Sequence, residues 1–234
     1  MALPDLPLPS VLLPPLYGLD IETDTTVDGL DPARAAVVAV ALSTPAGDEV
    51  LLGDEVDLLR RLEHRLDQLE PGILVTWNGR GFDLPFLAHR ARSSGVALSL
   101  ELWRDDPLPE PTADQELWPP PEGGFGARWG VHPHLDGYRT YRADVRRSLG
   151  VSCGLKAMAR LVGLPVVEVD REALHTLDDR TVADYVASDA RLARSLVQRR
   201  LPAVLGALDR PPVHDHRAAT PGPGPVPTAA RLPH

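Results

Sequence analysis

The sequence predicts an α/β fold from two kinds of hydrophobic periodicity. Near-continuous apolar runs at residues 35–43 and 73–77 have the pattern of strands that are buried on both faces. Apolar residues also recur at helical spacing over residues 56–69 and 178–208. The composition is ordinary for a globular domain, since 43% of the 234 residues are hydrophobic and 24% are charged.

Strands and helices alternate over the first hundred residues. Three strands come first, and the short links between them favour an antiparallel meander: residues 16–23, 35–43 and 49–52. Asp54 is suited to cap the helix at 56–69. A strand at 73–77, a helix at 82–93 and a further strand within 96–103 follow.

A long stretch with many Pro and Gly residues opens the second half. Residues 104–133 form an insert of a length that is usually functional or mobile in a compact domain. A short strand and three helices follow it: residues 134–136, 138–147, 155–162 and 178–208. We therefore expect three regions: an extended segment at 1–15, one domain at 16–210 containing the insert, and a disordered Pro/Ala-rich tail at 211–234.

Composition also excludes several classes of protein. No run of about 18 apolar residues is present, so no membrane span is expected. Prolines interrupt the first residues, which argues against a signal peptide. Cys153 is the only cysteine, which excludes an internal disulfide and a Cys-based zinc site and favours the cytoplasm. The net charge of −9 argues against loose coating of nucleic acid but leaves room for a local basic groove.

Two acidic residues in the first strand carry the first chemical signal. Asp20 and Glu22 are two positions apart, so their carboxylates project from the same face of a strand. Two buried like charges need a cation between them, and Mg²⁺ and Mn²⁺ prefer carboxylate oxygens. The alternative is that one of the carboxylates faces solvent at the end of the strand.

Two later stretches strengthen this interpretation. Asp83 follows a buried strand and a glycine-containing loop, where it could also serve only as a helix cap. Tyr185 and Asp189 lie four residues apart, on one face of the last helix. That face could be solvated, but Leu192 and Leu196 continue it with apolar side chains.

In this order, the residues resemble the three exonuclease motifs of the DEDD superfamily of 3′-5′ exonucleases: Asp20-Ile21-Glu22, Asn78 with Phe82-Asp83, and Tyr185 with Asp189. The tyrosine before the last aspartate is similar to the DEDDy subgroup. The stretch from Trp77 to Leu87 is most similar to the proofreading exonuclease domain of family B DNA polymerases. The resemblance covers about residues 16–201 and implies a ribonuclease H-like fold, a five-stranded mixed sheet flanked by helices.

The resemblance also implies a metal centre. Asp20, Glu22, Asp83 and Asp189 would hold two divalent cations, Mg²⁺ or Mn²⁺. Tyr185 would hydrogen-bond the attacking water, in an orienting role, because its hydroxyl is protonated at neutral pH. These five residues are the expected catalytic residues.

Three residues are expected to bind the substrate. By resemblance, Asn78 and Phe82 would contact the 3′-terminal nucleotides, although Phe82 fits a place in the core equally well. Arg80 lies in the loop before Asp83, where it could bind a phosphate. A basic stretch could guide the strand or form a solvated face: Arg139, Arg142, Arg146, Arg147, Lys156 and Arg160.

A histidine pair could also suggest a metal site. His132 and His134 lie close to Asp136, but no fourth ligand is apparent and a zinc site is not expected. Asp136 would either support the acidic cluster or cap the next helix.

Together these features predict a metal-dependent 3′-5′ exonuclease. It would act on the 3′ end of single-stranded nucleic acid, with DNA favoured, and release nucleoside 5′-monophosphates. One alternative is a ribonuclease D-like exoribonuclease, since no residue in the sequence is recognisable as a reader of the 2′-hydroxyl. Others are a non-catalytic nucleic-acid-binding module and a scaffold that binds an unknown protein partner through the insert and the tail.

Overall fold

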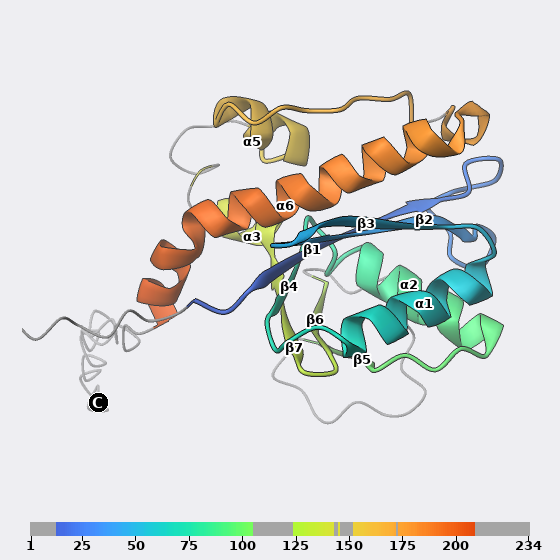
Figure 1. The fold of residues 1–234 in the computed structure, drawn as a ribbon, viewed down its shortest axis with the longest axis horizontal. Coiled ribbons are helices and arrows are strands. Elements are labelled where there is room, and N and C mark those ends of the chain that lie inside the picture. The colour runs from blue at the N-terminus through green and yellow to red at the C-terminus, as the bar shows by residue number, and fades with distance from the viewer. Residues whose placement is uncertain (1–12, 105–123, 143–144, 146–151, 172, 209–234) are drawn as a thin grey trace, which may run out of the picture. The chain divides into compact units, whose positions relative to one another are not determined.

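The computed structural model describes residues 13–104, 124–142, 145, 152–171 and 173–208. Its centre is a seven-stranded mixed sheet with the strand order β3-β2-β1-β4-β7-β6-β5 (Figure 1). The strands are β1 (Leu16–Thr23), β2 (Val37–Thr44), β3 (Gly47–Leu52), β4 (Ile73–Thr76), β5 (Leu100–Arg104), β6 (Phe125–Trp129) and β7 (His132–Asp136). The helices are α1 (Glu55–Asp67), α2 (Asp83–Ser94), α3 (Gly137–Tyr141), α5 (Leu155–Leu161) and α6 (Asp179–Leu208), with a 3₁₀ turn at Leu174–Thr176.

The predicted α/β fold is confirmed, and so is the opening meander. β1 pairs antiparallel with β2, and β2 pairs antiparallel with β3. β4 then runs parallel to β1, and β7 runs parallel to β4. The parallel pairs bring the carboxyl ends of β1, β4 and β7 to the same edge of the sheet.

The resemblance implied a five-stranded sheet, and that number was wrong, because the sheet has seven strands. The hydrophobic pattern of the sequence predicted six of the seven. The missed strand is β6, which lies inside the segment expected to be an insert and pairs antiparallel with β5 and β7. Its glycine and the Pro-rich sequence around it obscured the alternation of a strand. Residues 105–123 of that segment lie outside the described residues, as do 1–12 and 209–234.

Two hydrophobic layers cover the two faces of the sheet. On one face Leu19 and Ile21 of β1 pack with the buried leucines of α1 and with α2. On the other face Ala39 and Ala41 of β2 pack against α6. In Figure 1, α6 accordingly crosses the opposite face of the sheet from α1 and α2.

Helix α1 begins as its sequence predicts. The Asp54 carboxylate accepts hydrogen bonds from the backbone N–H groups of Val56 and Asp57, at 3.0 and 3.1 Å. Asp83, in contrast, is the first residue of α2 and not its N-cap, which is Phe82. The alternative that Asp83 serves only as a helix cap is therefore wrong.

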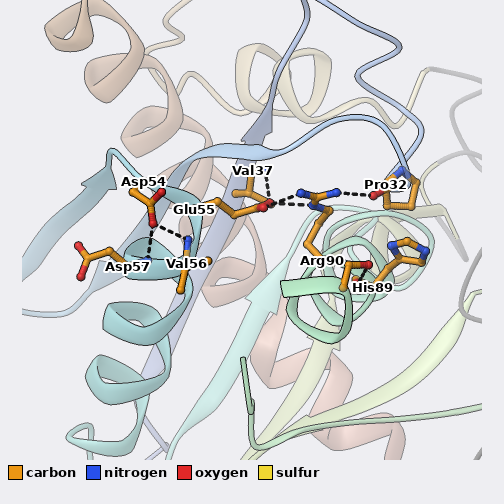
Figure 2. Close-up of polar contacts among 9 residues, drawn as sticks. Pro32, Val37, Asp54, Glu55, Val56, Asp57, His89 and Arg90 are labelled. Carbon is orange, nitrogen blue, oxygen red and sulfur yellow. Dashed lines mark hydrogen bonds and ion pairs between the residues drawn. The ribbon is translucent and has the colours of Figure 1, made fainter. Parts of the chain in front are cut away.

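A largely buried ion pair ties α1 and α2 to the loop between β1 and β2. Arg90 of α2 donates to both carboxylate oxygens of Glu55, at 2.8 and 2.6 Å (Figure 2). It also donates to the Pro32 carbonyl at 3.0 Å, while Glu55 accepts from the Val37 N–H at 2.8 Å. This network fixes the loop that follows the strand carrying Asp20 and Glu22.

The chain divides into two units, residues 1–201 and 202–234. All seven strands of the described chain lie in the first unit, and the described residues of the second, 202–208, are helical. The predicted domain limit at residue 210 stays a prediction. Within the described ranges no helix is both long and apolar enough to span a bilayer.

Candidate active site

A cavity of about 480 Å³ lies where the motif residues converge. Fourteen residues line it: Asp20, Ile21, Glu22, Leu30, Trp77, Asn78, Gly81, Phe82, Asp83, Leu155, Lys156, Arg171, Tyr185 and Asp189. All five residues predicted to be catalytic are among them, although they are spread over 170 positions of the chain. The fold thus brings the three motifs together.

Strand β1 presents the first two carboxylates. Asp20 and Glu22 alternate with Leu19 and Ile21, which point into the core beneath α1 and α2. Across the ladder Asp20 pairs with Ala41 and Glu22 pairs with Ala39, and both alanines pack on the α6 side. The two carboxylates therefore face α6, as the two-residue spacing predicts.

Helix α6 brings Asp189 to the same place because it lies directly on β1. A Cβ atom at Gly18 would stand 2.1 Å from the Ala190 carbonyl oxygen, so only glycine permits this approach. Tyr185 and Asp189, one turn apart, are 2% and 6% exposed. The alternative that this face of the helix is solvated is therefore wrong.

The loop between β4 and α2 brings the fourth carboxylate and two of the predicted substrate residues. Asp83 is 5% exposed and its carboxylate accepts the backbone N–H of Ile21, which links it to β1. Asn78 lines the cavity with a φ of 70°, a left-handed conformation that Asn tolerates better than most residues. Phe82 lines the cavity and also packs against the core, with its ring 5.2 Å from that of Phe86. The packing of Phe82 against the core is thus confirmed in part, and its contact with the 3′-terminal nucleotides stays a prediction.

Arg80 is not among the residues that line the cavity. Its side chain is close enough to the half-buried His134 to lower the pKa of that imidazole, after the larger effect of desolvation. The pKa of His134 falls to about 3, so the ring is neutral, and its Nε2 shares a hydrogen bond with Thr76 at 2.8 Å. The other histidine of the pair, His132, instead contacts the backbone of Leu66 and Gly72.

Burial raises the pKa of every carboxylate in the cavity, and the neighbouring carboxylates raise those of Asp20 and Glu22 further. Burial is the largest cause for Asp20, followed by the charges of Asp83, Glu22 and Asp189. The pKa of Glu22 rises to about 7, mainly through burial, although Arg171 opposes this shift. Burial likewise raises the pKa of Asp83 to about 7. The cluster therefore favours either protons or added positive charge.

Two basic residues supply part of that charge. Lys156, near the start of α5, places its Nζ 2.7 Å from Asp189 Oδ1 and 4.2 Å from the centre of the Tyr185 ring. Arg171 interacts electrostatically with four of the residues that line the cavity, and each of them raises the pKa of the Arg171 guanidinium: Glu22, Tyr185, Asp20 and Asp189. The sequence placed Lys156 in a basic stretch and at the start of a helix, and it gave no signal for Arg171.

Tyr185 is held in its protonated form. Burial raises its pKa above the ordinary value of 10, and the negative charges of Glu22 and Asp189 raise it further. Its hydroxyl forms a hydrogen bond with Asp189 that lowers the pKa of that carboxyl. A neutral phenol in this position can orient a water molecule but is a weak base.

The four carboxylates are the type of ligand that hard divalent cations prefer. Four carboxylates supply oxygen ligands, and their raised pKa values reflect uncompensated negative charge. Among the described residues, however, no three His, Cys, Asp or Glu side chains already stand in a metal-binding arrangement. A cation held by these four carboxylates would therefore need some adjustment of their side chains.

Comparison with known proteins identifies the relationship. Residues 38–103 match the model of the exonuclease domain of DNA polymerase family B, a region that includes Asp83 and its loop. A catalytic chain of DNA polymerase epsilon from Arabidopsis thaliana is 33% identical over 141 residues, which is 58% of this chain. The chain is related to the exonuclease domains of family B DNA polymerases. The resemblance to the proofreading domain within the DEDD superfamily is thereby confirmed.

Archaeal DNA polymerases are also similar to this chain. A DNA polymerase of Pyrococcus glycovorans is 28% identical over 97 residues, 36% of this chain. These matches span only 6% of the length of the Arabidopsis protein and 12% of the Pyrococcus polymerase. A family B DNA polymerase from Pyrobaculum calidifontis shares the fold, with a TM-score of 0.60 and 22% identity over 81% of this chain and 25% of its own.

Proposed function

We propose that this chain is a metal-dependent 3′-5′ exonuclease that hydrolyses the terminal phosphodiester of single-stranded nucleic acid, DNA in preference, and releases nucleoside 5′-monophosphates. The observation that carries the proposal is the convergence of the four acids and Tyr185 in one cavity. The relationship to exonuclease domains of DNA polymerases supports the direction of the reaction and the choice of DNA.

Asp20, Glu22, Asp83 and Asp189 would hold the two divalent cations. Bound there, Mg²⁺ or Mn²⁺ would lower the pKa of a water molecule and stabilise negative charge on the leaving 3′ oxygen. The raised pKa values of the carboxyl groups support this assignment, because a bound cation would stabilise carboxylates that burial, and then the neighbouring negative charges, disfavour. Metal binding would therefore displace protons from the cluster.

Tyr185 would orient the attacking water. Its raised pKa keeps the hydroxyl protonated, and its hydrogen bond to Asp189 fixes the direction of the ring. Lys156, which stands against both residues, would turn from Asp189 to the phosphate when cations are bound. The side chains of this chain thus position the water and neutralise the phosphate.

The wall of the cavity is suited to the bases of a strand end. Phe82 and Trp77 offer aromatic faces on which bases stack in a sequence-tolerant way. Leu30 is 67% exposed and borders the same cavity. Asn78 adds an amide that can bind the terminal sugar or base. These contacts support a substrate with unpaired bases.

Mn²⁺ binding and strand degradation, measured on the same preparations, test the proposal. Asp20→Ala is expected to weaken Mn²⁺ binding in calorimetry and to abolish release of nucleoside 5′-monophosphates from single-stranded DNA. Asp24→Ala is the matched control, because the Asp24 carboxylate accepts hydrogen bonds from the N–H and the hydroxyl of Thr26 and does not line the cavity. If Asp20→Ala leaves both properties intact, the metal assignment is wrong. Strand binding without cleavage by the unaltered protein would instead favour the non-catalytic module.

A further inference from the structure

The backbone N–H groups of the loop between β4 and α2 donate hydrogen bonds to buried side-chain oxygens. The N–H groups of Asn78 and Arg80 donate to the two carboxylate oxygens of Asp136, at 3.1 and 3.2 Å. Between them, the N–H of Gly79 donates to Thr76 Oγ1 at 3.1 Å. Three consecutive N–H groups are thus satisfied by the protein itself, so the loop backbone does not offer them to a phosphate.

The fold places Asp136 where it can do this. β7 runs parallel to β4, and Asp136 lies directly opposite Thr76 in the ladder. The carboxylate therefore reaches the chain as it leaves β4, and it is only 5% exposed. It also accepts the N–H of Arg139 at 3.4 Å and so caps α3. A buried carboxylate tolerates this position because backbone donors surround it.

This loop leads directly to the substrate wall of the cavity. Asn78, Gly81 and Phe82 line the cavity, whereas Asp136 and Thr76 do not. Asn78 has a φ of 70°, and the hydrogen bond from its N–H to Asp136 helps to hold its backbone there. The loop then passes into α2 through a hydrogen bond from the Leu84 N–H to the Gly79 carbonyl at 3.0 Å.

We infer that Asp136 is a positioning residue for the exonuclease, which fixes the loop at residues 78–82 so that Asn78 and Phe82 meet the 3′-terminal nucleotide. The inference rests on the proposed function and deepens it, because it separates a substrate-positioning device from the four metal-binding carboxylates. Of the two alternatives that the sequence left open for Asp136, the cap of the next helix is confirmed, and support of the acidic cluster stays a prediction.

Asp136→Asn is the direct test. The two carboxylate oxygens of Asp136 accept hydrogen bonds from two backbone N–H groups, whereas an asparagine has one oxygen and one NH₂ group, so one of the two hydrogen bonds is lost. We expect the KM for single-stranded DNA, measured at saturating Mn²⁺, to rise at least about tenfold, while kcat changes less than about threefold. The Mn²⁺ affinity is compared in variants of Thr76, because these leave the charge of Asp136 near Asp83 unchanged. Amide hydrogen exchange at Asn78 and Arg80 should accelerate. Asp54→Asn is the matched control, an aspartate that also accepts two backbone N–H groups but lies at the start of α1 (Figure 2).

A second pair of variants covers the case in which Asp136→Asn does not fold. Thr76→Val removes the acceptor for the Gly79 N–H, and Thr76→Ser keeps it. We expect a raised KM in the valine variant and rescue in the serine variant. An unchanged KM despite faster exchange in the loop would overturn the inference, as would a loss of kcat and Mn²⁺ binding at constant KM.

Failure of the exonuclease proposal can be distinguished from failure of the positioning role of Asp136. If the unaltered protein cleaves no strand, the exonuclease proposal fails, whatever the variants do. Affinity for a fluorescent single-stranded oligonucleotide in Ca²⁺ then replaces KM. Weaker binding by Asp136→Asn supports the positioning role, and unchanged binding overturns it.

Discussion

At the scale of single residues, a variant of Tyr185 can distinguish orientation of the attacking water from metal binding. Because its hydroxyl stays protonated beside Asp189, we predict that Tyr185→Phe lowers kcat about 10- to 100-fold. The KM and the Mn²⁺ affinity should remain near those of the unaltered protein, since the ring still fills its buried place. Steady-state kinetics and calorimetry measure the three quantities. A collapse of Mn²⁺ affinity would mean that the hydroxyl acts through the metal site instead.

The raised pKa values of the carboxyl groups predict a specific pH dependence. Glu22 and Asp83 have pKa values of about 7 in the folded protein, above their ordinary 4.5 and 3.8. Folded groups with raised pKa values stabilise the protein while protonated, and this stabilisation is lost as the pH rises through 7. Without divalent cations, the Tm should therefore fall as the pH rises from about 4.5 to about 7.5, the interval between the ordinary and the raised pKa values.

Divalent cations should reverse that trend. Mn²⁺ binds the deprotonated carboxylates, so its affinity should rise over the same pH interval and its stabilising effect should grow. Thermal unfolding with Mn²⁺ and with a chelator, at each pH, measures both. A chelator-treated protein whose Tm rises steadily over the whole interval would contradict the buried acidic cluster.

The sequence predicted the acidic residues because the chemistry restricts both residue type and spacing. The spacing of Asp20 and Glu22 puts them on one face of a strand, and the spacing of Tyr185 and Asp189 puts them on one face of a helix. The structure places all four side chains at the cavity. Arg171 could not be predicted in this way. It lies in an irregular segment before α6. The direction of a side chain follows from the sequence only where a helix or strand gives a regular period, and this segment has none.

The Glu55–Arg90 pair makes a prediction at the scale of secondary-structure elements. Their side chains are 12% and 17% exposed, and they join α1, α2 and the loop before β2 (Figure 2). Glu55→Gln leaves the Arg90 charge without its partner and should lower the free energy of unfolding by about 2–4 kcal/mol. Urea unfolding measures the change.

An exposed ion pair provides the control for that prediction. Arg128 and Glu101 pair on neighbouring strands with 52% and 60% of their side chains exposed. Glu101→Gln should change the free energy of unfolding by less than about 1 kcal/mol. Equal effects of the two substitutions would show that the buried network has no special part in holding the loop.

Elements with clear periodicity were predicted well, and those without it were not. The helix expected at 56–69 is α1, and its apolar positions Leu59, Leu62 and Leu66 are buried. β6 was missed because its pairing comes from β5 and β7, which are tertiary partners that no local pattern reveals. The close approach of α6 to β1 depends on Gly18, which the sequence alone did not single out.

At the scale of the whole molecule, the site lies within the first unit. All cavity residues fall between positions 20 and 189, inside residues 1–201. We therefore predict that deletion of residues 211–234 leaves the rate of strand degradation within about twofold, because every residue that lines the cavity lies in the first unit. A large loss of degradation with an unchanged Tm would instead assign the tail a part in substrate binding.

End-labelled strands test the central claim most directly. Single-stranded DNA and RNA, labelled at either the 3′ or the 5′ end, would be incubated with Mn²⁺ and the protein, with Asp189→Ala in parallel. We predict that the 5′-labelled DNA shortens stepwise from its 3′ end, that the 3′ label appears at once in mononucleotides, and that the variant does neither. Intact strands under every metal condition, or equal shortening by Asp189→Ala, would contradict the account.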